Sequence, residues 1–217
     1  MAVIDRHLQN KKISLHKSLN RIAQTFVATV LLLSPALKLN AQTEFSPDAA
    51  IQEVYNGIIS LYGSQAVPDL YYPVVPGSMM SSCGPVNTSS YCPPDHTIFI
   101  TTDHVDLAYE YGDAALAYIL AHEYAHAMQT AFGFKPDITP ISELQADCLG
   151  GLYLGLITNI YFDASDVEEI RSLAYRLGDY DTWGEQHHGT PQQRMDAVSI
   201  GINASGAGLE GASKCMI

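Results

Sequence analysis

Residues 114–132 read AALAYILAHEYAHAMQTAF, and this stretch predicts one helix buried at the centre of the fold. Apolar side chains, seven of them alanine, occupy nearly every face of such a helix, which is typical of a helix packed on all sides. The same stretch carries His122, Glu123 and His126, which are costly to bury unless they are paired or bind a metal. This conflict indicates a functional site inside the core.

These three residues form the pattern H-E-x-x-H. Histidines four residues apart share one face of a helix, so both imidazoles of His122 and His126 can reach one ion. Glu123 lies on the flank, where it can face a metal-bound water. The competing interpretation is a pair of histidines that are hydrogen-bonded inside an ordinary core.

The next predicted helix supplies two carboxylates, Glu143 and Asp147, which are again four residues apart. Glu143 can complete a set of two histidines and one glutamate, with the fourth zinc position left open. Asp147 can accept the spare ring N–H of a ligand histidine, and we expect His122 to be that histidine. Gly151 and Gly155 predict a close approach of this helix to the central one. The alternative is a solvated acidic face.

This set of ligands favours zinc, with cobalt or manganese as weaker alternatives. The residues predict a zinc-dependent endopeptidase that hydrolyses a peptide or protein substrate by metal-activated water, with Glu123 as the general base. Two alternatives are a non-catalytic zinc-binding or assembly module and a metallohydrolase that acts on a non-peptide amide. Glu123 favours catalysis, because a structural site has no use for it.

Four segments carry a family resemblance. They are YCPPDHTIFI (91–100), HEYAHAMQ (122–129), ELQADC (143–148) and HGTPQQR (188–194). They are similar to segments of the putative neutral zinc metallopeptidase family of bacteria, a gluzincin-type zincin group. The similarity extends over roughly residues 80–203.

The resemblance implies a zincin-like fold, zinc bound by His122, His126 and Glu143, and an extracytoplasmic or membrane-associated setting. It also places His188 in the family's HGT motif. We hypothesise that His188 donates a hydrogen bond to the tetrahedral oxyanion. Arg194 is expected to pair with Asp147 or another acid near the metal. The alternative is that both are ordinary surface residues.

Residues 1–41 hold six of the 11 basic residues and one of the 23 acidic residues. Their apolar run, Ile22–Leu37, contains Pro35 and is shorter than the about 20 residues that cross a bilayer. We therefore expect a signal peptide at 1–41 and a zinc metallopeptidase domain at 42–217, in the periplasm or secreted. The alternative is an uncleaved membrane anchor.

The formal charge of -12 and the absence of a basic patch exclude nucleic acid as a main partner. Cys83 and Cys92 lie among turn-forming residues and predict a local disulfide, which agrees with an exported protein. Cys148 and Cys215 either pair or stay free.

The fold class is predicted to be mainly α (α+β), a zincin-like helical metalloprotease domain with a small β element before the zinc-binding helix. Ser46-Pro47, Thr139-Pro140 and Thr190-Pro191 each predict a helix start, and Gln193 suits a capping box with Thr190. Ser165 with Glu168 predicts another capping box, and Asp113 is the expected cap of the central helix. The predicted helices span 47–62, 114–132, 140–158, 166–177 and 191–203.

The stretch 65–112 differs from the predicted helices, because it is rich in Pro, Gly, Tyr and Ser. Within it, Thr97–Thr102 is typical of a strand. This strand either forms a sheet edge that pairs with an extended substrate or is purely structural.

Overall fold

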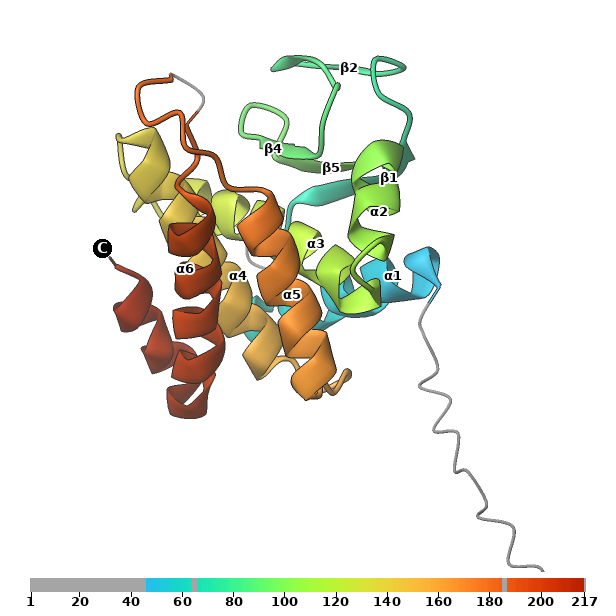
Figure 1. Ribbon diagram of the computed structural model, residues 1–217. Helices are drawn as coiled ribbons and strands as arrows, with labels where there is room; N and C mark the ends of the chain where they lie inside the picture. The colour runs from blue at the N-terminus through green and yellow to red at the C-terminus, as the bar shows by residue number, and fades with distance from the viewer. Residues whose placement is uncertain (1–45, 64–65, 185–186, 217) are drawn as a thin grey trace, which may run out of the picture. The chain divides into compact units, whose positions relative to one another are not determined.

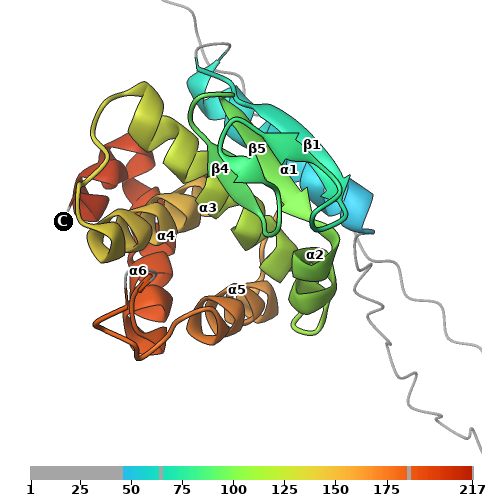
Figure 2. The ribbon, with the colours of Figure 1, turned by 90° about the horizontal axis from the view of Figure 1, so that it is seen from above.

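Helix α3 (Asp113–Ala131) lies at the centre of the fold, and other helices and a small sheet pack around it (Figures 1 and 2). The computed structural model describes residues 46–63, 66–184 and 187–216, so the predicted signal segment 1–41 lies outside the described residues. Every side chain from Ala114 to Ala125 is buried. The prediction of a buried central helix is confirmed, with bounds that differ by one residue at each end.

The helices around α3 make the described chain mainly helical, as predicted. They are α1 (Pro47–Tyr62), α2 (Thr102–Tyr109), α4 (Thr139–Leu156), α5 (Ala164–Arg176), α6 (Pro191–Ala204) and the 3-10 segment η1 (Ser205–Cys215). Helices α1, α4 and α5 pack against α3, and α6 packs against α4. Helix α2, which lies in the stretch 65–112, and the segment η1 were not among the predicted helices.

Two of the predicted helix starts form as expected. Ser46 caps α1, because its hydroxyl accepts a hydrogen bond from the backbone N–H of Ala49. Thr190 and Gln193 form the reciprocal capping box of α6, with a proline at the first helical position. These motifs are local, so the sequence alone specifies them.

Three other predicted caps are wrong. Helix α5 begins two residues earlier than expected, because Asp163 and Asp166 form its capping box instead of Ser165 and Glu168. Thr139 is the first residue of α4 and not its cap. Asp113 is the first residue of α3, and the carboxylate of Glu169 on α5 accepts a hydrogen bond from the nearby Ala114 N–H, at 3.2 Å.

The small β element precedes α3, as predicted. Strands β1 (Asp69–Val74), β5 (Thr97–Thr101) and β4 (Ser90–Cys92) form one sheet in the order β1-β5-β4, with β1 parallel and β4 antiparallel to β5. Strands β2 (Met80–Ser81) and β3 (Gly84–Pro85) form a separate antiparallel pair. Figure 2 shows that the three-stranded sheet lies over α1 and beside α3.

Strand β5 is the middle strand of its sheet and is buried along its whole length. Its Ile98 and Ile100 belong to the same apolar core as Val54 and Ile58 of α1. The hypothesis that Thr97–Thr102 is an open edge for substrate is therefore wrong, because both of its sides are already paired. Its role is to anchor the sheet to the core.

Glycine lets α4 approach two helices at once. A Cβ added at Gly150 would lie 3.1 Å from the backbone nitrogen of His122, so Gly150 is the residue that faces α3. Gly151 instead faces the backbone of Val198 on α6, and Gly155 faces Ser205. The expectation that Gly151 and Gly155 meet the central helix is thus wrong, although a close approach between the two helices exists.

Two disulfides cross-link the chain, one between residues close in sequence and one between residues far apart. Cys83–Cys92 forms as predicted, and Cys148 pairs with Cys215, which resolves the alternative left open by the sequence. Disulfides are typical of proteins that mature outside the reducing cytoplasm, so the pairs point to an extracytoplasmic location. Within the described residues, no helix combines the length and the apolar character that a membrane crossing requires.

Candidate metal centre

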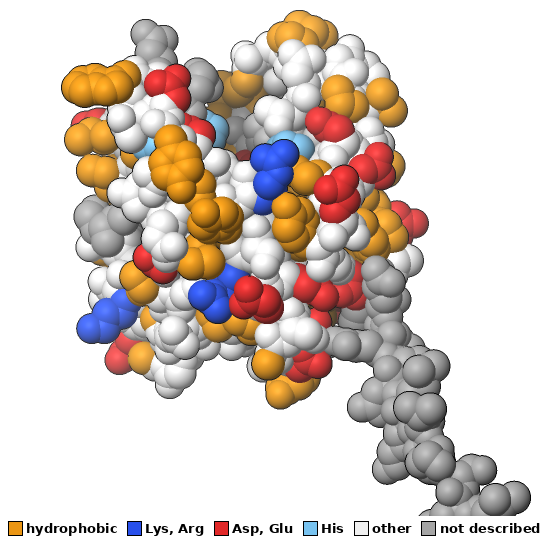
Figure 3. All heavy atoms as spheres, viewed as in Figure 1, with side chains coloured by type: hydrophobic (Ala, Val, Ile, Leu, Met, Phe, Trp, Pro, Cys, Tyr) orange, Lys and Arg blue, Asp and Glu red, His pale blue; other side chains and the backbone are white. Residues whose placement is uncertain are grey.

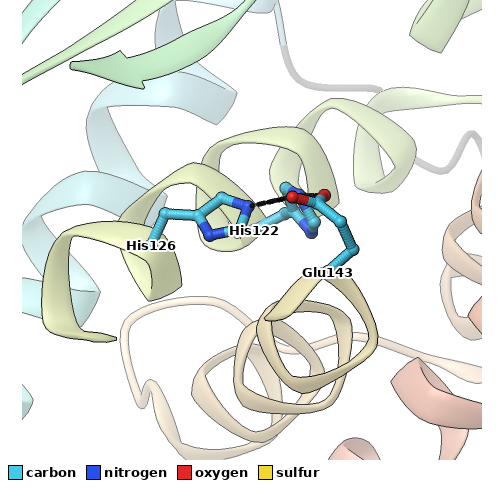
Figure 4. Close-up of side chains that lie close together, drawn as sticks. All are labelled: His122, His126 and Glu143. Atoms are coloured by element: carbon cyan, nitrogen blue, oxygen red, sulfur yellow. Dashed lines mark hydrogen bonds and ion pairs between the residues drawn. The ribbon is translucent and has the colours of Figure 1, made fainter. Parts of the chain in front are cut away.

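Three side chains from α3 and α4 converge on one point (Figure 4). The Nε2 atoms of His122 and His126 are 3.1 Å apart. Glu143 places Oε2 3.2 Å from Nε2 of His122 and Oε1 3.3 Å from Nε2 of His126. The two imidazole rings are perpendicular, with centroids 4.7 Å apart. The three donor groups therefore surround a common centre without blocking one another.

The spacing of these atoms fits a zinc ion. Zinc binds imidazole nitrogen and carboxylate oxygen at about 2.0–2.1 Å in tetrahedral sites, which puts neighbouring ligand atoms about 3.3–3.4 Å apart. The three observed separations, 3.1, 3.2 and 3.3 Å, lie close to that value. Two histidines and one glutamate are also a ligand set that leaves a fourth position for water or substrate.

Asp147 lies directly behind His122 and is fully buried. Its Oδ1 is 2.8 Å from Nδ1 of His122, and Arg194 donates from Nε to Oδ2 and from Nη2 to Oδ1, each at 2.8 Å. The hydroxyl of Tyr118 also donates to Oδ1. Burial alone would raise the pKa of Asp147, but Arg194 and His122 hold the pKa well below its usual range. The carboxylate is therefore ionised behind the ring.

Burial and the nearby charges shift the pKa of His122 in opposite directions. Desolvation lowers the pKa of His122, but the carboxylates of Asp147 and Glu143 outweigh it and raise the pKa to about 10. Burial raises the pKa of Glu143, and contacts with His122 and His126 more than offset this, so its pKa falls well below its usual range. Without an ion the pocket therefore retains a proton on His122. A metal must displace that proton when it binds.

Glu123 lies next to His122 on α3 and is 8% exposed. His188 comes from the segment before α6, and its Nδ1 is 3.9 Å from Oε2 of Glu143, beyond hydrogen-bond range but beside the centre. Its side chain is 42% exposed. Figure 3 shows a notch in the upper edge of the molecule, between the sheet and the segment that joins α5 to α6, with histidine side chains along it. The centre therefore has a route to solvent.

The backbone before α6 is fastened by Asp179. One oxygen of its carboxylate lies 2.7 Å from Nδ1 of His187, and the other accepts the backbone N–H of His188 at 3.3 Å. The ring of His187 therefore pairs with Asp179, whereas the ring of His188 lies beside Glu143.

Two polar residues of α3, Tyr118 and Gln129, also belong to the site and were not predicted from the sequence. Tyr118 lies one turn before His122 and contacts Asp147, and Gln129 lies three residues after His126 and contacts its ring. Both lie on the side of α3 that carries the two histidines. Helical spacing was the signal that could have found them. Tyr124, inside the motif, packs in the core against Tyr55 and Tyr153.

Comparison with known proteins places these residues in a wider group. The family model described as putative neutral zinc metallopeptidase matches residues 72–208. The uncharacterized protein YpfJ of Escherichia coli (strain K12) is 30% identical over 158 residues, which cover 59% of this chain and 53% of that protein. The uncharacterized protein Rv2575 of Mycobacterium tuberculosis (strain ATCC 25618 / H37Rv) is 24% identical over 163 residues, with 58% and 56% covered.

The chain thus spans about half the length of the curated relatives it matches. No solved structure matches it significantly. The matched range contains every side chain of the centre described above.

Proposed function

Because the chain belongs to the putative neutral zinc metallopeptidase family, we propose that it is a zinc-dependent endopeptidase that cleaves peptide or protein substrates. The observation that carries this proposal is the spacing of the donor atoms of His122, His126 and Glu143, which fits one tetrahedral ion. These three residues would hold the zinc. When bound, zinc supplies a Lewis acid that lowers the pKa of a water molecule to about 7 and polarises a carbonyl group.

Glu123 acts as the general base in this proposal. It accepts a proton from the attacking water and returns the proton to the leaving amine, so that one carboxylate serves both halves of the reaction. Its place next to His122, on the flank of the ligand-bearing face of α3, supports this role. Its low exposure also keeps bulk water from competing for the proton.

His188 donates a hydrogen bond to the oxygen that becomes negative during attack. Its contact with Glu143 and its partial exposure support that role, because the side chain lies beside the ligands and still meets solvent. Asp147 and Arg194 position His122. The carboxylate of Asp147, paired with Arg194, lies 2.8 Å from Nδ1 of His122, and its negative charge favours a hydrogen on that nitrogen, which leaves the lone pair of Nε2 for the ion.

The sequence and the disulfides support a setting outside the cytoplasm. We propose that residues 1–41 direct export of the domain at 42–217 to the periplasm or the exterior, with cleavage favoured over retention as a membrane anchor. Cys83–Cys92 and Cys148–Cys215 support export, because such pairs persist in oxidising compartments.

Metal analysis of three purified proteins tests the proposal. The wild type should contain one zinc per chain, Glu143→Ala should lose it, and Glu110→Ala should keep it because Glu110 is an exposed carboxylate directly after the end of α2. Casein cleavage by the wild type should stop with a chelator and return with added zinc.

Glu123→Gln separates chemistry from binding, since it keeps the shape of the side chain and removes the base. It should retain zinc and lose casein cleavage by a factor of at least about 10². Full activity of this variant would reject the proposed mechanism. A wild type that holds zinc but cleaves no peptide would point to the non-catalytic module, or to a non-peptide amide as substrate.

A further inference from the structure

Gln129 connects the ring of His126 to helix α4. Its side chain is fully buried. Its Nε2 lies 2.9 Å from the backbone oxygen of Ser142 and 2.9 Å from Oε1 of Gln145, both on α4. Its Oε1 lies 2.8 Å from Nδ1 of His126. One amide therefore joins a proposed ligand to the helix that carries Glu143.

The backbone oxygen of Ser142 determines which way this amide points. A carbonyl oxygen only accepts hydrogen bonds, so the atom of Gln129 that contacts it must be the NH2 group. The amide oxygen then faces His126, where the hydroxyl of Ser142 also donates to it at 3.3 Å. Because an amide oxygen only accepts, Nδ1 of His126 must carry the hydrogen in this contact.

This placement of the hydrogen determines what the other ring nitrogen can do. A neutral imidazole with its hydrogen on Nδ1 has a lone pair on Nε2. In His126, Nε2 is the atom that faces His122 and Glu143, at 3.1 and 3.3 Å. The ring therefore presents its lone pair to the common centre before any ion arrives.

We propose that Gln129 is a positioning residue of the metal centre, which selects the Nδ1–H tautomer of His126 and fixes the ring so that Nε2 binds a divalent cation. The proposal rests on the proposed function for the identity of the cation as zinc. It gives the two ligand histidines different supports. A buried carboxylate, Asp147, holds His122, and a neutral amide holds His126.

Zinc affinity of Gln129→Leu and Gln129→Glu, measured by competition with a chromophoric chelator, tests the role. Leucine removes the acceptor, and zinc affinity should fall about 10- to 100-fold, the usual cost of losing such a support. Glutamate keeps an oxygen opposite Nδ1, so its affinity should stay within tenfold of the wild type. Equal losses in both variants would overturn the proposal, because the loss would then follow the disturbed contacts with α4.

Gln145→Leu is the matched control. Gln145 is a second buried glutamine that contacts Gln129 but not the ring of His126, so its replacement should cost less than tenfold in zinc affinity. A loss as large as that of Gln129→Leu would also overturn the proposal. Urea unfolding of the metal-free variants shows whether a loss of zinc affinity comes from a less stable fold.

The tautomer itself is measurable without zinc. Long-range ¹H–¹⁵N NMR correlations of the imidazoles in the metal-free wild type, at a pH where the ring is neutral, should show His126 with hydrogen on Nδ1. Hydrogen on Nε2 would refute the assignment directly. A wild type that takes up no zinc would reject the proposed function, whereas this measurement would still decide the role of Gln129.

Discussion

Gly150→Ala tests whether the approach of α4 to α3 sets the geometry of the centre. The added Cβ would lie 3.1 Å from the backbone nitrogen of His122 and 3.2 Å from the carbonyl carbon of Ala121. Ordinary contacts of a Cβ begin at 3.4 Å. Helix α4 must therefore retreat by about 0.3 Å or more, since backbone atoms of a buried helix have little freedom to yield.

That retreat acts on Glu143, which α4 carries two turns before Gly150. Ligand distances in metal sites are held within about 0.2 Å, so a shift of this size exceeds the tolerance of the site. We expect zinc affinity to fall on the order of tenfold, which equals about 1.4 kcal/mol. Alanine in place of a helical glycine contributes about 1 kcal/mol of helix stability, which offsets part of the strain in the metal-free protein.

Chelator competition for zinc and urea unfolding of the metal-free protein measure the two effects separately. Gly206→Ala is the matched control, because its Cβ would meet no atom within 4 Å. It should leave zinc affinity unchanged. If Gly150→Ala binds zinc as tightly as Gly206→Ala, the distance between the two helices does not control the site and this reasoning is wrong.

Three further predictions concern the charges and the covalent link around the centre. Arg194→Met leaves the buried Asp147 without its cationic partner, so urea unfolding should show a loss of about 3–5 kcal/mol, and a loss below 1 kcal/mol would contradict the pairing. The raised pKa of His122 stabilises the metal-free protein fully below the unfolded value of about 6.5, and this contribution disappears as the pH rises through about 10. Melting temperatures of chelator-treated protein should therefore decline across that window, and those of the zinc-loaded protein should decline less, because the ion has replaced the proton. Replacing Cys148 and Cys215 together with alanine should lower the free energy of unfolding by about 2–5 kcal/mol, and an unchanged urea midpoint would refute this.

The sequence predicted the parts of the site that depend on spacing within one helix. His122 and His126 are four residues apart, as are Glu143 and Asp147, and helix geometry alone places each pair on one face. Helix geometry also predicts which glycine of α4 faces α3. At about 100° per residue, a position seven residues after Glu143 returns to within about 20° of its direction, whereas a position eight residues later lies about 80° away. Gly150 fits this rule and Gly151 does not.

Other features depend on contacts between distant residues. Glu169 supports the start of α3 from α5, which no local pattern reveals. Helical spacing places Gln129 beside His126, but its hydrogen bond to the backbone of Ser142 depends on how α4 packs. The middle position of β5 depends on pairing with β1, which lies well before it in the chain. Asp163 displaced the expected Ser165 cap because its carboxylate accepts two backbone N–H groups, from Ser165 and Asp166, and so begins the helix earlier.

The bond between Cys148 and Cys215 has a consequence for how the protein matures. Cys148 directly follows Asp147 on α4, and Cys215 lies 67 residues later, at the end of η1. The bond can close only after α5 and α6 have been synthesised and have folded back over α4. Oxidation is therefore a late event that fixes the helix bearing Glu143, and metal uptake measured on reduced chains reports on an incompletely matured protein.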